Sequence, residues 1–459
     1  MKGVSTEVPE RGRSHRRPAW ARSGRRVAAT TLAFVSACVA LGACGSSSDG
    51  GGGASADKHV AITVWDGQTN ISAADAAKIK ANFERTHPNI TVKLMPGSTG
   101  SGSILEKITA AMAANATPNI SYVFGSNLAQ VAQSPQVVDL TDVVQQPGWA
   151  FPDLFPAAQR GVTVEGKVKG VPVGMDDVAV FYNKKIFKQA GVPLPKPGWT
   201  WDDYRKTAKR LTDAGKGVYG TGLPGGGGSD TTWYTTPMIW QAGGDIVNAD
   251  GTKVAFGDEP GLKTLQLLHD MAQVDKSVYV DTSPGYPKLL QLFTAGRVGM
   301  YLGDTWQFPG IKDAKLDYGV VPVPVWNRGD QPITQAGVQA WVVFDHGDAE
   351  NKAAQEFLKW QSAPAQEAKW DATIGLPALG AAAQNTPTYQ KFLKSTPGAD
   401  VFNAQLASNT RTFPTIPTLD AILQELGKAE AAALLDGGTN LSHALQQAVD
   451  KANAAIATG

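Results

Sequence analysis

The sequence is poor in cysteine and in charge, and it shows no strong excess of charge of one sign. Only two of its 459 residues are cysteine, which excludes a disulfide scaffold and a Cys-rich zinc protein. Charged residues make up 18%, too few for a disordered polyampholyte or a long coiled coil. The net charge of +1 excludes a strongly basic nucleic-acid binder. The apolar share of 42% supplies real cores, and the length predicts two or three domains.

The motifs of common catalytic and metal sites are also missing. The sequence has no HExxH motif, no GxSxG elbow, no Walker loop and no dinucleotide fingerprint after its first predicted strand. Asp176 and Asp177 are adjacent carboxylates, but neighbours on an extended segment point to opposite faces and are poorly placed to flank one glycosidic bond. We therefore expect a protein without catalytic activity, without a bound metal and without a cofactor. The six histidines are scattered without metal-like spacing: His15, His59, His87, His269, His346 and His443.

The N-terminus has the features of an export signal. Residues 1–26 hold eight basic and two acidic residues, and Val27–Ala40 is an apolar run of about 14 residues. That run is too short to span a bilayer, which needs roughly 20 residues, so a secretory signal peptide over 1–43 is predicted. Leu41–Cys44 resembles a bacterial lipobox, which makes Cys44 the expected site of lipid attachment. An uncleaved membrane anchor and a plain signal peptide with an incidental cysteine stay open, as does the choice between Sec and twin-arginine export.

The segment after the predicted lipid site differs from the rest of the chain. Residues 44–57 are rich in Gly and Ser, which predicts a flexible tether. Without residues 1–43 the chain has 34 basic and 39 acidic residues, a net charge of about −5. The near-neutral balance of the whole chain is thus a cancellation between a basic leader and a mildly acidic body. No second apolar stretch of membrane-spanning length follows.

The body begins with an alternation of predicted strands and helices. Strands are predicted at 60–65, 90–94 and 120–124, with helices at 72–86 and 104–116 between them. This order is typical of βαβ units with a parallel sheet and helices on both faces. Further along, we predict extended segments at 171–182, 298–302 and 318–321, and helices at 201–211, 236–242, 262–275, 286–295, 349–361 and 419–457.

Tryptophan is the positive chemical signal. Eleven of the 12 tryptophans lie after residue 43, and several stand at the ends of predicted elements beside short polar residues, as Trp65, Trp233, Trp306 and Trp341 do. Aromatic faces pack against the C–H faces of a sugar ring while carboxylates and amides bind its hydroxyls. Ligands of open α/β sheets bind outside the carboxyl ends of the strands. The pattern therefore favours a carbohydrate site, although any single tryptophan can equally belong to a core.

Four segments between about 170 and 380, with the lipoprotein-like N-terminus, resemble the family 1 extracellular solute-binding proteins. These are lipoprotein receptors of carbohydrate-importing ABC transporters. The segments are 170–184 with 197–203, then 241–248 with 255–256, then 292–306, and finally 319–324 with 336–343 and 354–360.

The resemblance implies the α/β periplasmic-binding-protein type II fold, with two α/β lobes, a ligand cleft and a hinge that the chain crosses more than once. Crossings are expected near 172–178, 335–343 and 405–412. Lobe I is expected at 58–175 plus about 340–405, and lobe II at about 176–335 plus about 410–459. Hinge closure around the ligand is the mechanism that this fold implies.

The resemblance also implies ligand-binding positions. Trp65, Gln68 and Asn70 fall at the loop after the first strand, and Ser126 and Asn127 at the loop after the third. Asp176 falls at the hinge, where maltose-type binders carry a carboxylate, and Trp233 and Trp306 fall at positions of stacking aromatics. The third strand departs from those binders because it ends in Phe124-Gly125 rather than in tryptophan. The expected location of a cleft adds Asp304, Gln339, Trp341 and Arg411; Asp176 as a hinge cap and Arg411 as a surface ion pair are the competing structural roles.

The function that the resemblance implies is capture of a sugar or oligosaccharide and its delivery to an ABC permease. The protein is then a monomer anchored by lipid to the outer face of the cell membrane, with no nucleic-acid partner. A phosphorylated polyol or another non-sugar solute is the alternative ligand, and it requires two or more cationic groups in the cleft. An exported glycoside hydrolase using Asp176 or Asp304, and a purely structural lipoprotein, are the alternatives from other classes. The sugar, its linkage and length, the affinity and the permease are not determined by the sequence.

Overall fold

A computed structural model gives the structure of the chain, and it describes residues 59–67, 73–97, 101–408 and 410–458, without the side chains of 101–103. All of the described residues belong to the unit Ala56–Gly459, which the following sections concern. The predicted signal peptide, the tether and Cys44 lie outside the described residues, as do Gln68 and Asn70.

The predicted alternation at the start of the body is confirmed. Strands β1, β2 and β3 are parallel neighbours, with α1 and α2 between them in sequence. Ile62 and Val64 of β1 are buried and alternate with more exposed residues, as a half-buried strand requires. The bounds are β1 (Val60–Asp66), α1 (Ala73–Thr86), β2 (Ile90–Pro96), α2 (Ser101–Ala113) and β3 (Ile120–Phe124).

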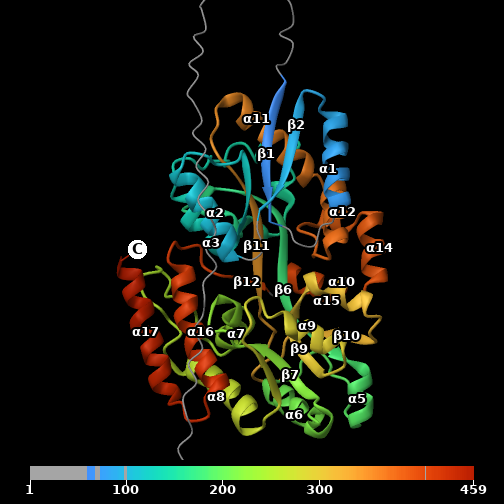
Figure 1. The fold of residues 1–459 in the computed structure, drawn as a ribbon, viewed down its shortest axis with the longest axis vertical. Coiled ribbons are helices and arrows are strands. Elements are labelled where there is room, and N and C mark those ends of the chain that lie inside the picture. The colour runs from blue at the N-terminus through green and yellow to red at the C-terminus, as the bar shows by residue number, and fades with distance from the viewer. Residues whose placement is uncertain (1–58, 68–72, 98–100, 409, 459) are drawn as a thin grey trace, which may run out of the picture. The chain divides into compact units, whose positions relative to one another are not determined.

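Two long strands join the two ends of the sheet. The strand order is β2-β1-β3-β11-β6-β9-β7-β8, with β10 paired to β6 and β12 to β11 (Figure 1). The first half of β6 pairs with β11, and its second half pairs with β9 and β10. The bounds are β6 (Val171–Asn183), β7 (Tyr219–Pro224), β8 (Val278–Asp281), β9 (Val298–Asp304), β10 (Tyr318–Val321), β11 (Thr334–Val343) and β12 (Thr410–Thr412), with a separate hairpin of β4 (Thr163–Val164) and β5 (Lys167–Val168).

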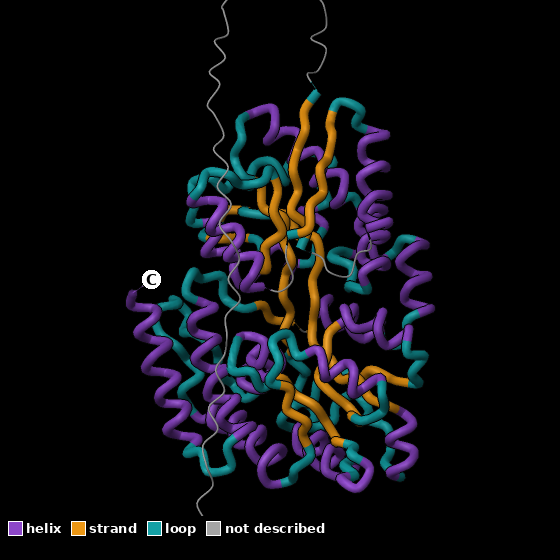
Figure 2. Tube along the Cα trace, in the orientation of Figure 1, coloured by secondary structure: helices purple, strands orange, loops and turns teal. Residues whose placement is uncertain are grey.

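Helices surround the strands along the described chain (Figure 2). The longer ones are α3 (Gly125–Ala132), α4 (Pro156–Gly161), α5 (Lys184–Ala190), α6 (Trp201–Leu211), α7 (Ser229–Gln241), α8 (Glu259–His269), α9 (Pro287–Thr294), α10 (Phe308–Asp313), α11 (Asp348–Ser362), α12 (Pro364–Ile374), α14 (Pro387–Ser395), α15 (Ala399–Ser408), α16 (Leu419–Leu435) and α17 (Leu441–Thr458). Short turns of helix complete them: η1 (Phe151–Asp153), η2 (Ala214–Lys216), η3 (Asp270–Val274), η4 (Thr305–Gln307) and α13 (Ala381–Gln384).

Two helix predictions have wrong bounds, each for a local reason. Helix α7 begins at Ser229, well before the predicted start at 236, and it contains Pro237 and several threonines that lower its helix propensity. The burial of its middle turns stabilises it instead, because nine of its residues are buried. The C-terminal tail is two helices rather than one, since Gly437 and Gly438 separate α16 from α17.

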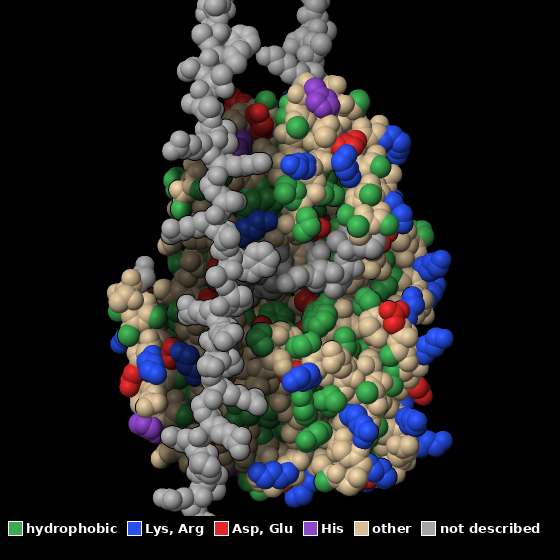
Figure 3. Space-filling model, in the orientation of Figure 1, with side chains coloured by type: hydrophobic (Ala, Val, Ile, Leu, Met, Phe, Trp, Pro, Cys, Tyr) green, Lys and Arg blue, Asp and Glu red, His purple; other side chains and the backbone are tan. Residues whose placement is uncertain are grey.

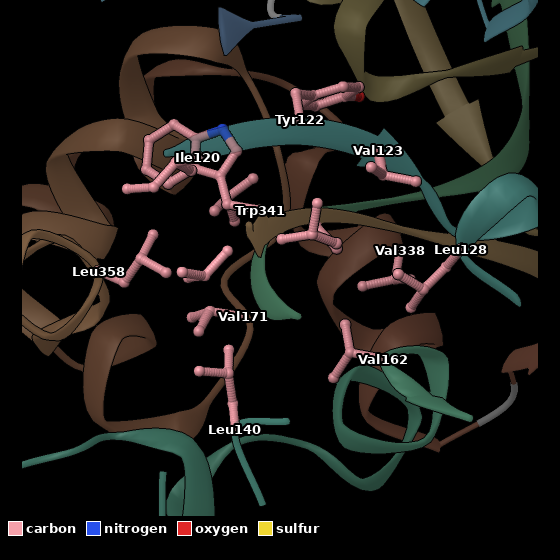
Figure 4. Packing of buried hydrophobic residues seen from close by; sticks show 14 of the residues in the cluster. Ile120, Tyr122, Val123, Leu128, Leu140, Val162, Val171, Val338, Trp341 and Leu358 are labelled. Atoms are coloured by element: carbon pink, nitrogen blue, oxygen red, sulfur yellow. The ribbon is translucent and has the colours of Figure 1, made fainter. Parts of the chain in front are cut away.

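Along β6, Asp176 and Asp177 separate the residues of two large hydrophobic cores. One includes Met175 with residues of β1, β3, β11, α11 and α12, and Figure 4 shows part of it. The other begins at Val178 and includes residues of β7, β9, α7, α8, α16 and α17. We propose that these cores are those of lobes I and II, with the boundaries given above. None of the described helices has both the length and the apolar character that crossing a membrane requires.

Candidate functional site

Asp176 lies where β6 leaves one core and enters the other, and it is buried. Its Oδ1 accepts hydrogen bonds from the Thr305 backbone N–H (3.0 Å), the Thr305 hydroxyl (2.7 Å) and the Asp177 N–H (3.1 Å). Asp177 faces elsewhere, because its Oδ2 accepts from Gln405 Nε2 of α15 at 2.9 Å. The two adjacent carboxylates therefore point into different surroundings, as neighbouring positions on a strand predict.

Asp304 ends β9 and is the centre of an aromatic cluster. Its Oδ1 accepts from Trp233 Nε1 at 2.9 Å, and its Oδ2 accepts from Trp306 Nε1 at 3.1 Å and from the Tyr234 hydroxyl. All seven residues of β9 are buried, so the strand delivers Asp304, only 2% exposed, into the interior. The first turns of α7 supply Trp233 and Tyr234 from 70 residues earlier in the chain.

Tyr286 completes this cluster. Its hydroxyl lies 3.1 Å from that of Tyr234, the two rings meet edge to face with centroids 5.5 Å apart, and the Trp306 ring is 6.5 Å away. Tyr286 has φ 40° and ψ 48°, the left-handed region that non-glycine residues rarely adopt. Such backbone conformations are concentrated at ligand-binding sites. Together, Trp233, Tyr234, Tyr286, Trp306 and Asp304 are called the aromatic cluster below.

The charge of this region is negative. Burial raises the pKa of Asp176 well above its usual range, and the neighbouring charge of Asp304 adds to the effect. Burial also raises the pKa of Asp304, to about 6, although the hydrogen bonds from Tyr234, Trp233 and Trp306 oppose the shift. Asp304 is therefore the carboxylate of the pair that is ionised at neutral pH. No described lysine or arginine forms an ion pair with either residue.

The opposite half of the sheet contributes Trp65 and Tyr122. Trp65 is half-buried at the end of β1, and Lys107 Nζ lies 4.0 Å from its ring centroid. Burial raises the pKa of the Tyr122 hydroxyl, and the negative charges of Asp66 and Asp176 raise it further, which places Tyr122 within electrostatic range of both. A Cβ atom on Gly67 would lie 2.3 Å from the Tyr122 ring, so only glycine allows the chain after β1 to pass so close.

The sequence predicted Ser126 and Asn127 in a loop, but they lie in the first turn of α3. The helix begins at Gly125 directly after β3, and a Cβ atom at this position would lie 2.6 Å from Val338 Cγ1, so glycine allows the close approach to β11. Asn127 is 3% exposed, and its Oδ1 has no hydrogen-bond partner among the described residues.

Gln339 and Arg411 occupy the crossing strands. Gln339 of β11 is opposite Gly174 of β6 and Phe124 of β3. Arg411 of β12 forms an ion pair with Asp245 at 2.6 Å and lies over the Trp240 ring at 4.7 Å. The structural role that the sequence left open for Arg411, an ion pair, is thus present.

Trp341 lies apart from the other predicted ligand residues. It is 1% exposed, and its ring packs against Phe357 and Trp370 at centroid distances of 5.6 and 5.8 Å. Side chains alternate along β11, and this one points into the hydrophobic core with Val171 and Leu358. We therefore leave Trp341 out of the site proposed below.

Sequence reasoning missed Tyr234, Tyr286, Thr305 and Tyr122. Two of them had a signal beside a predicted residue: Tyr234 follows Trp233, and Thr305 lies between Asp304 and Trp306. Tyr286 had a weaker one, since it stands between Gly285 and the helix-starting Pro287. Within the described residues, no group of three or more His, Cys, Asp or Glu side chains is arranged to hold a metal ion.

Comparisons with known proteins agree with this architecture. The Streptomyces coelicolor protein named diacetylchitobiose binding protein DasA is 25% identical over 454 residues, covering 92% of this chain and all of that protein. The Pectobacterium atrosepticum protein named sn-glycerol-3-phosphate-binding periplasmic protein UgpB is 24% identical over 416 residues, covering 86% and 91%.

Solved structures show the same fold. The Listeria monocytogenes ABC substrate-binding protein Lmo0181, in complex with cycloalternan, has a TM-score of 0.75 at 24% identity and covers 87% of this chain and 100% of its own. UgpB from Mycobacterium tuberculosis, in complex with glycerophosphocholine, has a TM-score of 0.77 at 18% identity and covers 86% and 98%. The fold is thus the two-lobed α/β fold of the maltose-binding-protein type, as predicted. The family model described as bacterial extracellular solute-binding protein matches residues 66–368, more than half of the chain, and the chain belongs to that family.

Proposed function

We propose that the protein captures a sugar or oligosaccharide between its two lobes and delivers it to the permease of an ABC transporter, without catalysing a reaction. The observation that carries this proposal is the aromatic cluster itself. Three ring donors converge on the single carboxylate of Asp304, so the rings are held in fixed positions around a buried polar centre. Family membership, and the name of DasA among the relatives, support the same class of ligand.

The chemistry of the cluster suits a sugar. Trp233 and Trp306 are only partly buried, so ring surface stays available for the C–H faces of a pyranose. The carboxylates and tyrosine hydroxyls can exchange hydrogen bonds with sugar hydroxyls. Ligand that touches both lobes favours the closed state through its higher affinity for that state, and hinge closure follows.

A phosphorylated polyol is the second candidate, because several relatives are named as sn-glycerol-3-phosphate-binding proteins. The charges at the cluster argue against it. A phosphate is bound by cationic donors, whereas the carboxylate of Asp304 places negative charge there and no described lysine or arginine forms an ion pair with it. The nearby Arg411 is engaged by Asp245, and Lys107 donates to the carbonyl oxygens of Pro96 and Gly97. The face in Figure 3 bears many lysines and arginines, but they lie on the surface rather than around this buried pair.

A glycoside hydrolase fits the same residues less well. Asp176 and Asp304 each accept three hydrogen bonds from the protein, so both carboxylates already have structural roles that need no substrate. Aryl glycosides offer a direct check. Turnover by the purified protein that disappears in Asp304→Asn would replace the binding function with an enzymatic one.

The proposal includes anchoring at the outer face of the cell membrane. It rests on the lipobox-like Leu41–Cys44, on residues outside the described structure. Labelling cells with a fatty-acid probe is the test: wild-type protein should carry the label, and Cys44→Ala should not. The proposed state of the mature protein is a monomer.

The decisive experiment is titration calorimetry with neutral sugars of one to four units, including diacetylchitobiose, and with glycerol-3-phosphate. We expect heat and a change in tryptophan fluorescence with at least one sugar. Trp233→Ala should abolish both, while the control variant Trp199→Ala, whose ring lies in the second core beside Tyr204 and has no contact with Asp304, should retain them. Binding of glycerol-3-phosphate alone would establish the second candidate instead.

A further inference from the structure

The indole of Trp233 is held at both of its ends. Its Nε1 donates to Asp304, and the far edge of its six-membered ring lies against the backbone of Gly337. A Cβ atom on Gly337 would lie 2.6 Å from Cη2 and 2.8 Å from Cζ3 of that ring. These distances are shorter than van der Waals contact allows, so the ring position requires glycine at 337.

This ring also lies where the three crossing strands meet. Asp304 pairs with Val178 of β6, and Gly337 of β11 pairs with Asp176 of β6. Phe413 follows β12 directly, and its ring meets Trp233 edge to face at 6.1 Å. Trp233 therefore contacts Gly337 of β11 and Phe413, which follows β12. It is also hydrogen-bonded to Asp304, the sheet partner of Val178 of β6.

We propose that Asp304 is a positioning residue that holds Trp233, Tyr234 and Trp306 in the ligand-binding arrangement, and that Trp233, braced on Gly337, transmits ligand stacking to the crossing strands. This inference rests on the proposed function, and it adds a positioning residue for the ligand-binding rings. Hydrogen bonds to an ionised acceptor are about twice as strong as neutral ones, so one carboxylate can fix three rings. Rings that are fixed before binding lose little conformational freedom when ligand arrives, which raises affinity.

The first test uses Asp304→Asn with Asp275→Asn as its matched control. Asp275 also accepts hydrogen bonds from two side chains, Arg205 and Lys209, and its side chain is 4% exposed, but it contacts none of the aromatic cluster. We expect Asp304→Asn to weaken sugar binding by about 10- to 100-fold, the value of one or two charge-assisted hydrogen bonds. The near-ultraviolet circular dichroism of the ligand-free protein should change as the rings lose their fixed positions. Asp275→Asn should change neither affinity nor spectrum, whatever its melting temperature.

The second test is a double-mutant cycle between Asp304→Asn and Trp233→Phe, a variant that keeps an aromatic ring but lacks the N–H donor. If Asp304 acts through the Trp233 ring, the double variant should bind little worse than the weaker single variant. Affinity losses that multiply, or an unchanged spectrum in Asp304→Asn, would overturn the proposal. If the wild-type protein binds no sugar at all, the proposed function fails, while the spectra still decide whether Asp304 positions the rings.

Gly337→Ala separates the two parts of the inference. The added methyl should displace Trp233 without touching the Asp304 carboxylate, so binding should weaken and the extent of ligand-induced closure, followed by small-angle scattering, should fall. Gly215→Ala is the control for the loss of glycine, because Gly215 is exposed, has no positive φ, and a Cβ atom there would meet nothing closer than Asp213 Oδ1 at 3.4 Å. Full ligand-induced closure in Gly337→Ala would contradict the part of the proposal in which the contact between Trp233 and Gly337 transmits ligand stacking.

Discussion

Asp176 accepts both the backbone N–H and the hydroxyl of Thr305, a residue 129 positions later in the chain. The first turn after β9 is thereby attached to the strand that passes between the two cores. Asp304 and Trp306, the neighbours of Thr305, receive their positions in the aromatic cluster from this attachment. Four experiments follow from this arrangement and from the buried groups around it.

Thr305→Val removes the hydroxyl donor and keeps the shape of the side chain. Asp176 then loses one of its hydrogen bonds in a buried position, and we expect the free energy of unfolding to fall by about 1–2 kcal/mol. Sugar affinity should fall with it, since the turn that bears Trp306 is held less firmly. Urea unfolding and calorimetry measure the two effects. Thr305→Ser, which restores the hydroxyl, should recover most of the affinity; failure to do so would mean that the bond to Asp176 is not what matters.

Ligand affinity should depend on pH through Asp304. The charged or titratable groups that face it are Asp176, Asp230, Tyr234 and Tyr286, and its pKa is raised to about 6. Ionised Asp304 is the better acceptor for the ring donors, so affinity should decrease as pH falls through about 6. The sign for folding is opposite: the raised pKa favours the protonated folded state, and this contribution is lost as pH rises from the usual value of 3.8 through about 6. Asp304→Asn should remove the pH dependence of binding, and an equally steep profile in that variant would contradict the assignment.

Glu430 provides a test of stability away from ligand binding. This fully buried residue of α16 accepts a hydrogen bond from the Thr235 hydroxyl, and burial raises its pKa to about 8. The stabilising effect of its proton is complete below the usual pKa of 4.5 and is lost as pH rises through about 8. Glu430→Gln keeps the acceptor and cannot ionise. We expect it to be more stable than the wild type by on the order of 1–3 kcal/mol near pH 8, and nearly equal at acid pH. Thermal melts across this range measure the difference, which should grow with pH.

Trp341→Phe distinguishes a core residue from a ligand residue. Its indole N–H has no hydrogen-bond partner among the described residues, so the change removes only volume from the core. We expect a loss of about 1–3 kcal/mol in the free energy of unfolding and unchanged sugar affinity. A fall in affinity without a fall in stability would return Trp341 to the ligand site that the sequence suggested.

Local sequence patterns predicted the elements that depend on local interactions. The β-branched run at 60–65 is found as β1, and the helix predicted at 72–86 is found as α1. Both predictions depend on periodic patterns that span only a few turns of the chain. Helix α7 was placed too late because its threonines and Pro237 are unfavourable locally, and packing against α16, α8, β11 and β7 compensates them.

In the candidate site, too, the sequence revealed the residues with a local signal and missed those that depend on distant contacts. The structure brings Asp304, Trp233 and Trp306 together, and family resemblance with strand-end position was sufficient to select them. Tyr234 and Tyr286 depend on a contact between residues 52 positions apart, which no local pattern reveals. Trp341 lies on β11, and a strand of ten largely buried residues gives no alternation from which to tell whether its side chain faces the core or the ligand site.

The position of β11 between β3 and β6 has a consequence for how the chain can fold. The residues of β3 and their partners on β11 lie more than 200 positions apart, so the first core cannot close until the chain has been made well past residue 340. Contacts of such long separation slow folding, because loop closure must precede the interactions that stabilise it. The N-terminal third of the molecule therefore stays incompletely folded until a strand from more than 200 positions later in the chain has been synthesised.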